Sequence, residues 1–201
     1  MSRDTSKGEE TRALILDRAL DLASVSGLEG LTIGMLADQL KMSKSGLFAH
    51  FGAKAELQLA LLRHAVDRFV TSVVAPALKM PRGELRVRAL VDGWIVWDRD
   101  AFPGGCVLQA AAAEYDDVEG PIRDYVVESQ RDWFDTLSQV ARTAIQSKAF
   151  RDDLDPRVFA FDLTNILAGY RRHARLFREP DAEALTRAAF EALLDRSRPL
   201  A

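Results

Sequence analysis

Helical periodicity extends through almost the whole chain and limits what the chain can fold into. Between Glu9 and Ser26, apolar residues recur every three or four positions with charged residues between them, and comparable patterns follow along the 201 residues. No stretch alternates polar and β-branched residues over the length of a sheet strand. The sequence therefore predicts an all-α fold.

Capping residues, glycine and proline divide this pattern into about nine helices. Thr32 is a favourable N-cap, Gly27 is typical of the residue after a helix, and Pro156 suits a first helical position. The predicted helices cover residues 9–26, 33–40, 44–51, 53–75, 83–100, 106–116, 121–149, 156–178 and 181–196. Because the first three are short and closely spaced, we expect a compact three-helix domain over residues 1–54. A long helix then joins it to a larger helical domain over residues 55–201.

Composition excludes several classes of protein. The chain is 48% hydrophobic and 28% charged, which is typical of a folded globular protein. Its single cysteine, Cys106, rules out an intrachain disulfide framework and a cysteine-cluster zinc site. No apolar run approaches the roughly 18 residues of a membrane span, and the first residues lack an apolar signal segment. We therefore expect a cytoplasmic protein that does not bind a membrane. The net charge of −3 argues against a wholly basic surface, although it leaves room for a local basic patch.

Residues 31–51 have the spacing of a helix-turn-helix. Leu36, Leu40 and Leu47 are predicted to pack inward against Ile15, Ala19 and Leu22 of the first helix. From Lys41 to Lys54 the chain contains three lysines, one histidine and no acidic residue, which suits contacts with DNA phosphates. The alternative is a solvated turn between two core helices. Capping, spacing and charge all agree with the DNA-binding interpretation.

The same residues resemble a known family. The pairs Thr11-Arg12, Ile15-Leu16, Ala19-Leu20, Gly27-Leu28 and Leu36-Ala37, with Leu31-Thr32-Ile33 and the block from Ser43 to Leu57, are similar to the DNA-binding domain of TetR-family transcriptional regulators. The resemblance covers about residues 9–60, and the later helices resemble the family's ligand-binding and dimerisation domain in number and length. It implies a homodimeric regulator, most often a repressor. Such a protein binds a partly palindromic operator in double-stranded DNA and releases it when a small hydrophobic effector binds.

The resemblance also implies which residues contact DNA. Base-reading residues would begin the second helix of the motif, an aromatic residue would pack on sugar and phosphate, and helix starts would bind further phosphates. The candidate DNA-binding residues are Thr32, Ser43, Lys44, Ser45, Gly46, Phe48, His50 and Lys54. Two positions depart from the family pattern. Lys41 stands where the turn usually has glycine, so a left-handed backbone costing about 1 kcal/mol and a distorted turn are expected. Gly34 stands where many members have a DNA-contacting side chain.

Two late helices are predicted to pair with a second copy of the chain. The candidate dimerisation residues are Phe159, Leu163, Ile166, Gly169, Tyr170, Leu185, Ala189 and Ala192. Gly169 lies within a helix, where glycine costs about 1 kcal/mol relative to alanine, and the close approach of a partner helix would explain that cost. Two helices from each copy would form a four-helix interface. The alternative is that both apolar stripes face the core of their own chain.

Aromatic residues of the larger domain are candidates for an effector site. The candidates are Trp94, Trp97, Phe102, Tyr115 and Trp133, with Gln109, Asn165 and His173 as polar anchors. Aromatic walls suit a hydrophobic ligand, although aromatic residues at helical spacing also build cores. Cys106 follows two glycines at a predicted helix start, where a thiol can be reactive. The same regulator could therefore sense electrophiles or oxidants through Cys106. The alternative is a small packing residue.

Motifs of enzyme chemistry do not occur in the sequence. The three histidines lie on different predicted helices, and there is no His-x-x-x-His pair, phosphate-binding glycine loop or Gly-x-Ser-x-Gly motif. We therefore expect no catalytic activity, no cofactor and no metal. An all-helical enzyme acting on a small hydrophobic molecule and an adaptor that only dimerises are the alternative classes. Neither explains the residues from Ser43 to Lys54.

Overall fold

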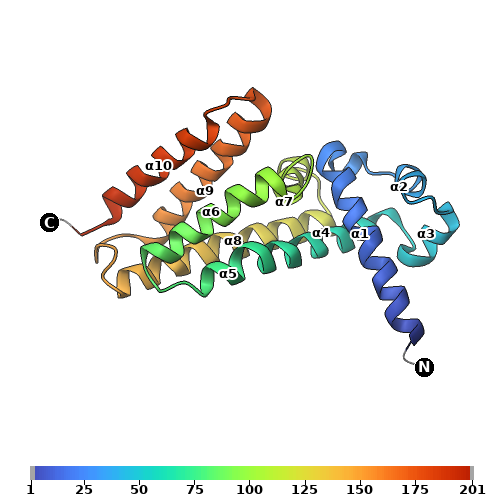
Figure 1. Cartoon of the computed structure of the whole chain (residues 1–201), viewed down its shortest axis with the longest axis horizontal. Coiled ribbons are helices and arrows are strands. Elements are labelled where there is room, and N and C mark those ends of the chain that lie inside the picture. Colours follow the sequence, from blue (N-terminus) through green and yellow to red (C-terminus); the bar gives the residue numbers. More distant parts are fainter. Residues whose placement is uncertain (1–2, 200–201) are drawn as a thin grey trace. The chain divides into compact units, whose positions relative to one another are not determined.

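A computed structural model describes the backbone of residues 3–199, and each regular element in that range is a helix (Figure 1). The elements are α1 (Arg3–Gly30), α2 (Ile33–Leu40), α3 (Lys44–Phe51), α4 (Lys54–Phe69), η1 (Val70–Val74), α5 (Ala75–Leu78), α6 (Glu84–Asp100), α7 (Val107–Glu114), α8 (Pro121–Gln146), α9 (Pro156–Arg171), η2 (Arg172–Phe177) and α10 (Ala182–Ser197). The π-helical segment η1 joins α4 to α5, and the π-helical segment η2 extends α9. The described residues therefore form nine continuous helical stretches, and the all-α prediction is confirmed.

Several predicted helix ends differ from the structure, two of them at a glycine or a proline. The first helix is kinked at Gly27, whose backbone angles are φ 78° and ψ 166°, and one further turn follows up to Gly30. The fourth helix does not end before Pro76 but continues to Leu78. In η1 the Ala75 amide donates to the Val70 carbonyl, five residues earlier. The local hydrogen-bond pattern has thus already left the α-helical spacing where Pro76, which has no amide hydrogen, enters the helix.

The chain forms two compact units, each of which is described by itself. The first unit contains residues 1–68 and 100–128, and the second contains residues 69–99 and 129–201. Residues 100–128 therefore belong to the same compact unit as the helix-turn-helix. The domain boundary after residue 54 stays a prediction.

Apolar side chains of α1, α2 and α3 form the core of the helix-turn-helix. Ile15, Ala19, Leu36 and Leu47 are buried, as predicted. Leu40 and Leu22 are only half-buried. Leu40 is the last residue of α2, next to the turn, so fewer neighbours cover it.

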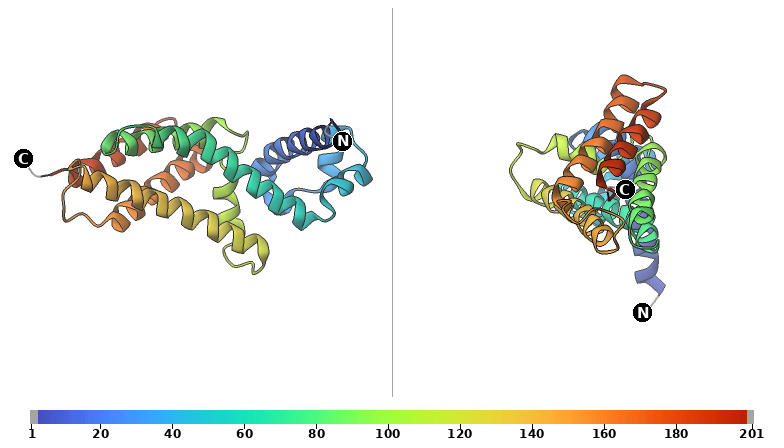
Figure 2. Two further views of the ribbon diagram at one scale, coloured as in Figure 1. Left: turned by 90° about the horizontal axis from the view of Figure 1, so that it is seen from below. Right: turned by 90° about the vertical axis from the view of Figure 1, so that its left-hand side faces the viewer.

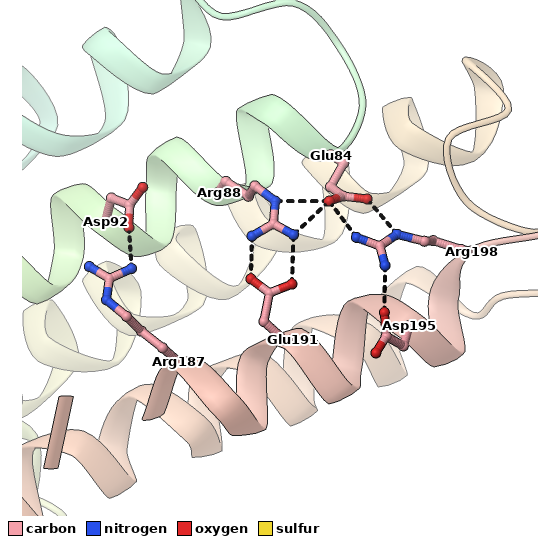
Figure 3. Close-up of polar contacts among 7 residues, drawn as sticks. All are labelled: Glu84, Arg88, Asp92, Arg187, Glu191, Asp195 and Arg198. Carbon is pink, nitrogen blue, oxygen red and sulfur yellow. Dashed lines mark hydrogen bonds and ion pairs between the residues drawn. The ribbon is translucent and has the colours of Figure 1, made fainter. Parts of the chain in front are cut away.

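The second unit has an aromatic core and a polar seam between two helices. Phe69 packs edge-on against Trp97 and Trp133, with ring centroids 5.5 and 5.1 Å apart. Helices α9 and α10 lie side by side (Figures 1 and 2). The polar seam lies between α6 and α10, where charged residues of one helix pair with charged residues of the other (Figure 3). Over residues 3–199, no helix combines the length and the apolar composition needed to cross a membrane.

Candidate nucleic-acid interface and sensor residues

Side-chain caps define the starts of both helices of the helix-turn-helix. Thr32 Oγ1 accepts a hydrogen bond from the Met35 amide at 3.1 Å. Ser43 Oγ accepts one from the Gly46 amide, also at 3.1 Å. Both caps have extended backbone angles, as N-cap residues do. The two predicted caps are confirmed, and they fix where the exposed amides of α2 and α3 begin.

The turn between these helices has a left-handed lysine. Lys41 has φ 54° and ψ 36°, as its replacement of the family's glycine predicted. The turn is nevertheless regular, which corrects the expected distortion. The Met42 amide donates to the Ala37 carbonyl at 3.0 Å and the Lys41 amide to the Asp38 carbonyl at 3.3 Å, the pattern of a Schellman motif. These bonds satisfy the last carbonyls of α2, so the chain keeps the turn and bears the strain at one residue.

Helix α3 separates a buried face from an exposed one. Leu47 and Phe51 point into the core, whereas Lys44, Ser45 and Phe48 are exposed. The Phe48 side chain is 47% exposed, which is unusual for an aromatic residue. A polar helix start followed by an exposed ring can contact base edges and the sugar-phosphate backbone.

The Gly34 departure leaves room for a lysine. A Cβ atom built on Gly34 would lie 3.6 Å from Lys44 Cε, 3.7 Å from Lys44 Nζ and 3.8 Å from Thr32 Oγ1. The Lys44 ammonium group therefore lies beside the first turn of α2. The N-terminal end of a helix carries partial positive charge, so both features attract an anion to the same place.

Lys54 and Arg12 make contacts within the chain near the DNA-binding candidates. Lys54 Nζ lies 2.7 Å from the Glu29 carbonyl oxygen and 3.0 Å from Glu29 Oε2, so this lysine forms an ion pair within the chain. Arg12 was not among the candidates, although its Nη1 donates to the His50 carbonyl oxygen and its guanidinium lies 4.4 Å from the Phe51 ring centroid. Arg12 thereby holds the C-terminal end of α3. The motif pair Thr11-Arg12 was its only signal in the sequence.

The predicted dimerisation residues differ in their exposure. Phe159, Leu163 and Tyr170 are buried inside the second unit, so their side chains do not lie on an exposed face of the chain. Ile166 and Gly169 are half-buried, while the α10 candidates Leu185, Ala189 and Ala192 are exposed. The exposed apolar face of α9 contains Val158 and Phe161, with exposed fractions of 54% and 62%. Helix α9 has apolar residues on two faces, so periodicity alone could not tell the inward face from the outward one.

Gly169 does not touch another part of its own chain. Apart from its chain neighbours and the backbone of its own helix, no atom of the described chain lies within 4 Å of a Cβ built on it. The glycine is therefore not explained by close packing inside the described chain.

The effector-site candidates are divided between the two units. Trp94, Trp97 and Trp133 are buried in the second unit, where Trp94 packs against Tyr170 with ring centroids 6.1 Å apart. Phe102, Gln109 and Tyr115 belong to the first unit. Which of the eight candidates contact an effector stays a prediction.

The remaining candidates have structural roles within the chain. Asn165 is exposed on α9, and its Nδ2 donates to the Phe161 carbonyl at 2.7 Å. His173 Nδ1 pairs with the Glu179 carboxylate across η2. Cys106 is buried at the start of α7. Burial is typical of a packing cysteine, because reactive cysteines are usually partly exposed.

A buried ion pair of the second unit was not predicted. Asp98 is buried, and its Oδ1 lies 2.9 Å from Arg171 Nη1. Arg175 Nη2 donates to the Asp98 backbone carbonyl at 2.8 Å. Burial, and then the charge of Asp98, raise the pKa of Tyr170. No group of histidine, cysteine and acidic side chains in the described part of the chain is arranged to hold a metal ion.

Capped helices joined by a tight turn, with an exposed basic start on the second helix, define a helix-turn-helix DNA-binding regulator. Comparison with known families agrees. Residues 15–61 match the family described as bacterial regulatory proteins, tetR family. Residues 83–190, more than half of the chain, match the tetracyclin repressor-like C-terminal domain. The chain therefore belongs to the TetR family of transcriptional regulators.

Solved structures share the fold over nearly the full length. A TetR transcriptional regulator from Chloroflexus aurantiacus is 26% identical, with a TM-score of 0.83 and coverage of 94% of this chain and 95% of that one. A transcriptional regulator from Saccharomonospora viridis, solved in complex with choline, is 21% identical, with a TM-score of 0.81 and coverage of 96% and 100%. AibR, solved with isovaleryl coenzyme A and operator DNA, is 22% identical, with a TM-score of 0.70 and coverage of 94% and 100%. Among curated proteins, none has a sequence that matches this chain.

Proposed function

We propose that this chain is a homodimeric repressor that binds a partly palindromic operator and releases it when a small hydrophobic effector binds. The exposed start of α3 is the observation that carries the DNA-binding part. Lys44, Ser45 and Gly46 would face base edges, and Phe48 and His50 would contact the backbone. Thr32, Ser43 and Lys54 would add phosphate contacts at helix starts. For Lys54 to do so, its pair with Glu29 must open.

The arrangement of Lys44 supports this assignment. Its ammonium lies beside the first turn of α2, and the stretch from Lys41 to Lys54 has no carboxylate that would repel a phosphate. An α-helix fits the major groove, where base pairs present distinct patterns of donors and acceptors. One recognition helix from each of two copies would read successive major grooves about 34 Å apart.

The test compares two exposed lysines. Operator fragments are selected from the source genome, and binding of the parent, Lys44→Ala and Lys79→Ala is measured by fluorescence anisotropy at several salt concentrations. Lys44→Ala should lose about tenfold or more of its preference for operator over random DNA, since a good base contact contributes roughly 1–3 kcal/mol. Lys79, an exposed lysine outside the helix-turn-helix, is the control and should leave the preference unchanged. Equal preference in all three proteins would place the recognition face elsewhere.

A second copy is proposed to cover the outward faces of α9 and α10. Val158, Phe161 and Ala168 line this face on α9, and Leu185 and Ala192 line it on α10. Exposed apolar residues at helical spacing on two adjacent helices favour a four-helix interface between copies. Gly169, which no part of its own chain approaches, would allow a partner helix to come close.

The aromatic core of the second unit supports a hydrophobic effector. Phe69, Trp97 and Trp133 pack together there, and Trp94 lies against Tyr170. The relatives solved with choline and with isovaleryl coenzyme A were bound to chemically different molecules, so the shared fold leaves the effector open. All three tryptophans belong to the second unit, so binding beside them would change tryptophan fluorescence, to which the first unit does not contribute. Sensing of electrophiles by Cys106 is the alternative, and the burial of that thiol favours the effector proposal.

A further inference from the structure

The turn in front of the helix-turn-helix lacks a cap of its own. After the kink at Gly27, the chain makes one more helical turn up to Gly30, directly before the α2 cap Thr32. The first amides of such a turn, those of Leu28 and Glu29, have no partner within it. Serine, threonine, aspartate or asparagine usually supplies the acceptor from the preceding position. That position is occupied by Gly27, which has no side chain.

The acceptor comes instead from α7. Glu114, the last residue of α7, accepts the Leu28 amide at 2.7 Å on Oε2 and the Glu29 amide at 2.8 Å on Oε1. The capping carboxylate is thus 86 residues away from Leu28 in the sequence. A negative charge at the start of a helical turn also interacts favourably with its dipole. Two features of the Gly27 position favour glycine. Its φ is positive, and a Cβ would lie only 2.9 Å from Glu114 Oε1.

Tyr115, the residue directly after α7, extends the contact. The Tyr115 hydroxyl donates to the Glu29 carboxylate, and Gln58 Nε2 of α4 lies 3.3 Å from the same hydroxyl and donates to the Leu28 carbonyl at 2.9 Å. Tyr115 and Gln58 are each only 3% exposed. Burial, followed by the hydrogen bond to Glu29, raises the pKa of Tyr115, so its hydroxyl stays protonated as a donor. The Tyr115 hydrogen bond and then that of Lys54 lower the pKa of Glu29, so it remains a carboxylate.

A second contact holds the start of α7 against α1. The Gly104 amide donates to Ser24 Oγ at 2.9 Å. A Cβ built on Gly104 would lie 1.8 Å from the Ser24 carbonyl oxygen, so the loop before α7 passes directly over the α1 backbone. Helix α7 is therefore tied to α1 at both of its ends. It is also part of residues 83–190, which match the family's C-terminal domain.

We propose that Glu114 and Tyr115 are positioning residues for DNA binding. By capping the turn of residues 28–30, they set the direction in which the chain enters α2, and so the presentation of α2 and α3 to DNA. The proposal rests on the proposed function for its effect on DNA affinity. Its structural part, the cap itself, can be tested without DNA.

The experiment compares matched acidic residues in the full-length chain. Glu114→Gln keeps one carbonyl acceptor and loses the other, Glu114→Ala loses both, and Tyr115→Phe removes only the hydroxyl. Glu119→Gln is the control, since Glu119 is an exposed acid of the loop that follows α7. Hydrogen–deuterium exchange reports the amides of Leu28 and Glu29. Anisotropy reports affinity for operator and for random DNA, and circular dichroism reports helix content.

Glu114→Ala should speed exchange at both amides by about tenfold or more, as expected for the loss of a hydrogen bond to a charged group, and Glu114→Gln should do so at one of them at least. The same variants should show a weaker preference for operator over random DNA. The Glu119→Gln control should match the parent in both readouts. General destabilisation without a positioning role would leave the preference of the folded fraction unchanged, and this outcome would overturn the proposal. So would unchanged exchange in Glu114→Ala. If Glu114→Ala does not fold, Glu114→Gln decides by the same criteria, and Tyr115→Phe decides by its preference for operator DNA. If the parent shows no DNA preference, the proposed function fails, while the exchange data still test the cap.

Discussion

Lys41 has a conformational cost that glycine in the same position would avoid. A left-handed backbone costs a residue with a Cβ roughly 1–2 kcal/mol. The Schellman hydrogen bonds of Ala37 and Asp38 hold it in place regardless. A lysine at this position adds positive charge beside the proposed DNA face, which is a physical reason for accepting the strain.

Lys41→Gly should therefore stabilise the chain. The gain from relieving the left-handed strain exceeds the roughly 0.5–1 kcal/mol that glycine costs through the freedom of the unfolded chain. We expect the free energy of unfolding to rise by about 0.5–1 kcal/mol, measured by urea denaturation. Lys41→Ala is the control, because it removes the charge and keeps the Cβ. Equal stability of the two variants would show that the backbone of Lys41 is not strained.

At the scale of elements, the N-cap of α3 serves both stability and recognition. Ser43 caps α3 as Asp155 caps α9, where Asp155 Oδ1 accepts the Arg157 amide at 2.7 Å. Only α3 belongs to the proposed DNA face. The two caps can therefore be compared: Ser43 belongs to the proposed DNA face, and Asp155 lies outside the helix-turn-helix.

Ser43→Ala and Asp155→Ala should each cost about 1 kcal/mol of stability, the usual loss for an N-cap. Only Ser43→Ala should also weaken operator binding, since fraying of the first turn of α3 displaces Lys44 and Ser45. Thermal melting and anisotropy measure the two effects. An equal loss of operator affinity in both variants would mean that stability, and not the recognition helix, limits binding.

Charges of alternating sign join α6 to α10 (Figure 3). Glu84, Arg88 and Asp92 of α6 pair with Arg198, Glu191 and Arg187, respectively. Sliding α10 along α6 by one turn would bring like charges together, so the pattern favours a single register. The hydrogen bond from Arg198, together with that from Arg88, holds the pKa of Glu84 below its ordinary value of 4.5.

Because of Glu84, the free energy of unfolding should fall as the pH becomes acidic. A carboxylate whose pKa is lower in the folded state stabilises the fold above its unfolded pKa, and this contribution is lost as the pH falls through the folded pKa. Between pH 7 and about pH 3, the parent should therefore lose more stability than Glu84→Gln, which has no such proton to bind. Urea denaturation at a series of pH values measures this difference. Glu128→Gln, at an exposed position, should follow the parent curve. Parallel curves for the parent and Glu84→Gln would show that the seam is not coupled to pH.

At the scale of the whole molecule, pairing of two copies decides how strongly an operator is bound. Two linked recognition helices gain from effective concentration, so loss of the dimer lowers operator affinity even when each copy folds. The outward face of α9 has the most exposed aromatic side chain of that helix, Phe161.

Phe161→Glu should produce a folded monomer, because two carboxylates would be buried near each other across the interface. Sedimentation velocity measures the assembly, and circular dichroism measures helix content. Val96→Glu is the control, since Val96 is a similarly exposed apolar residue on α6. A dimer that persists in Phe161→Glu would place the interface on another face.

The sequence by itself determined the helices, their caps, the helix-turn-helix and the family. Each of these depends on residues a few positions apart, such as the serine of a cap and the amide three residues later, so it is written locally in the chain. The left-handed Lys41 belongs with them, since the turn between α2 and α3 allows one backbone conformation there.

Tertiary structure alone decided the rest. Phe159 and Phe161 are the same type of residue two positions apart, and only packing against the rest of the chain buries one and exposes the other. Glu114 accepts a hydrogen bond from Leu28, and Tyr115 donates one to Glu29. Both bonds lie within the first unit and join residues more than 80 positions apart. No local pattern records such a contact, because its free energy depends on the folded chain bringing both ends together and removing them from water.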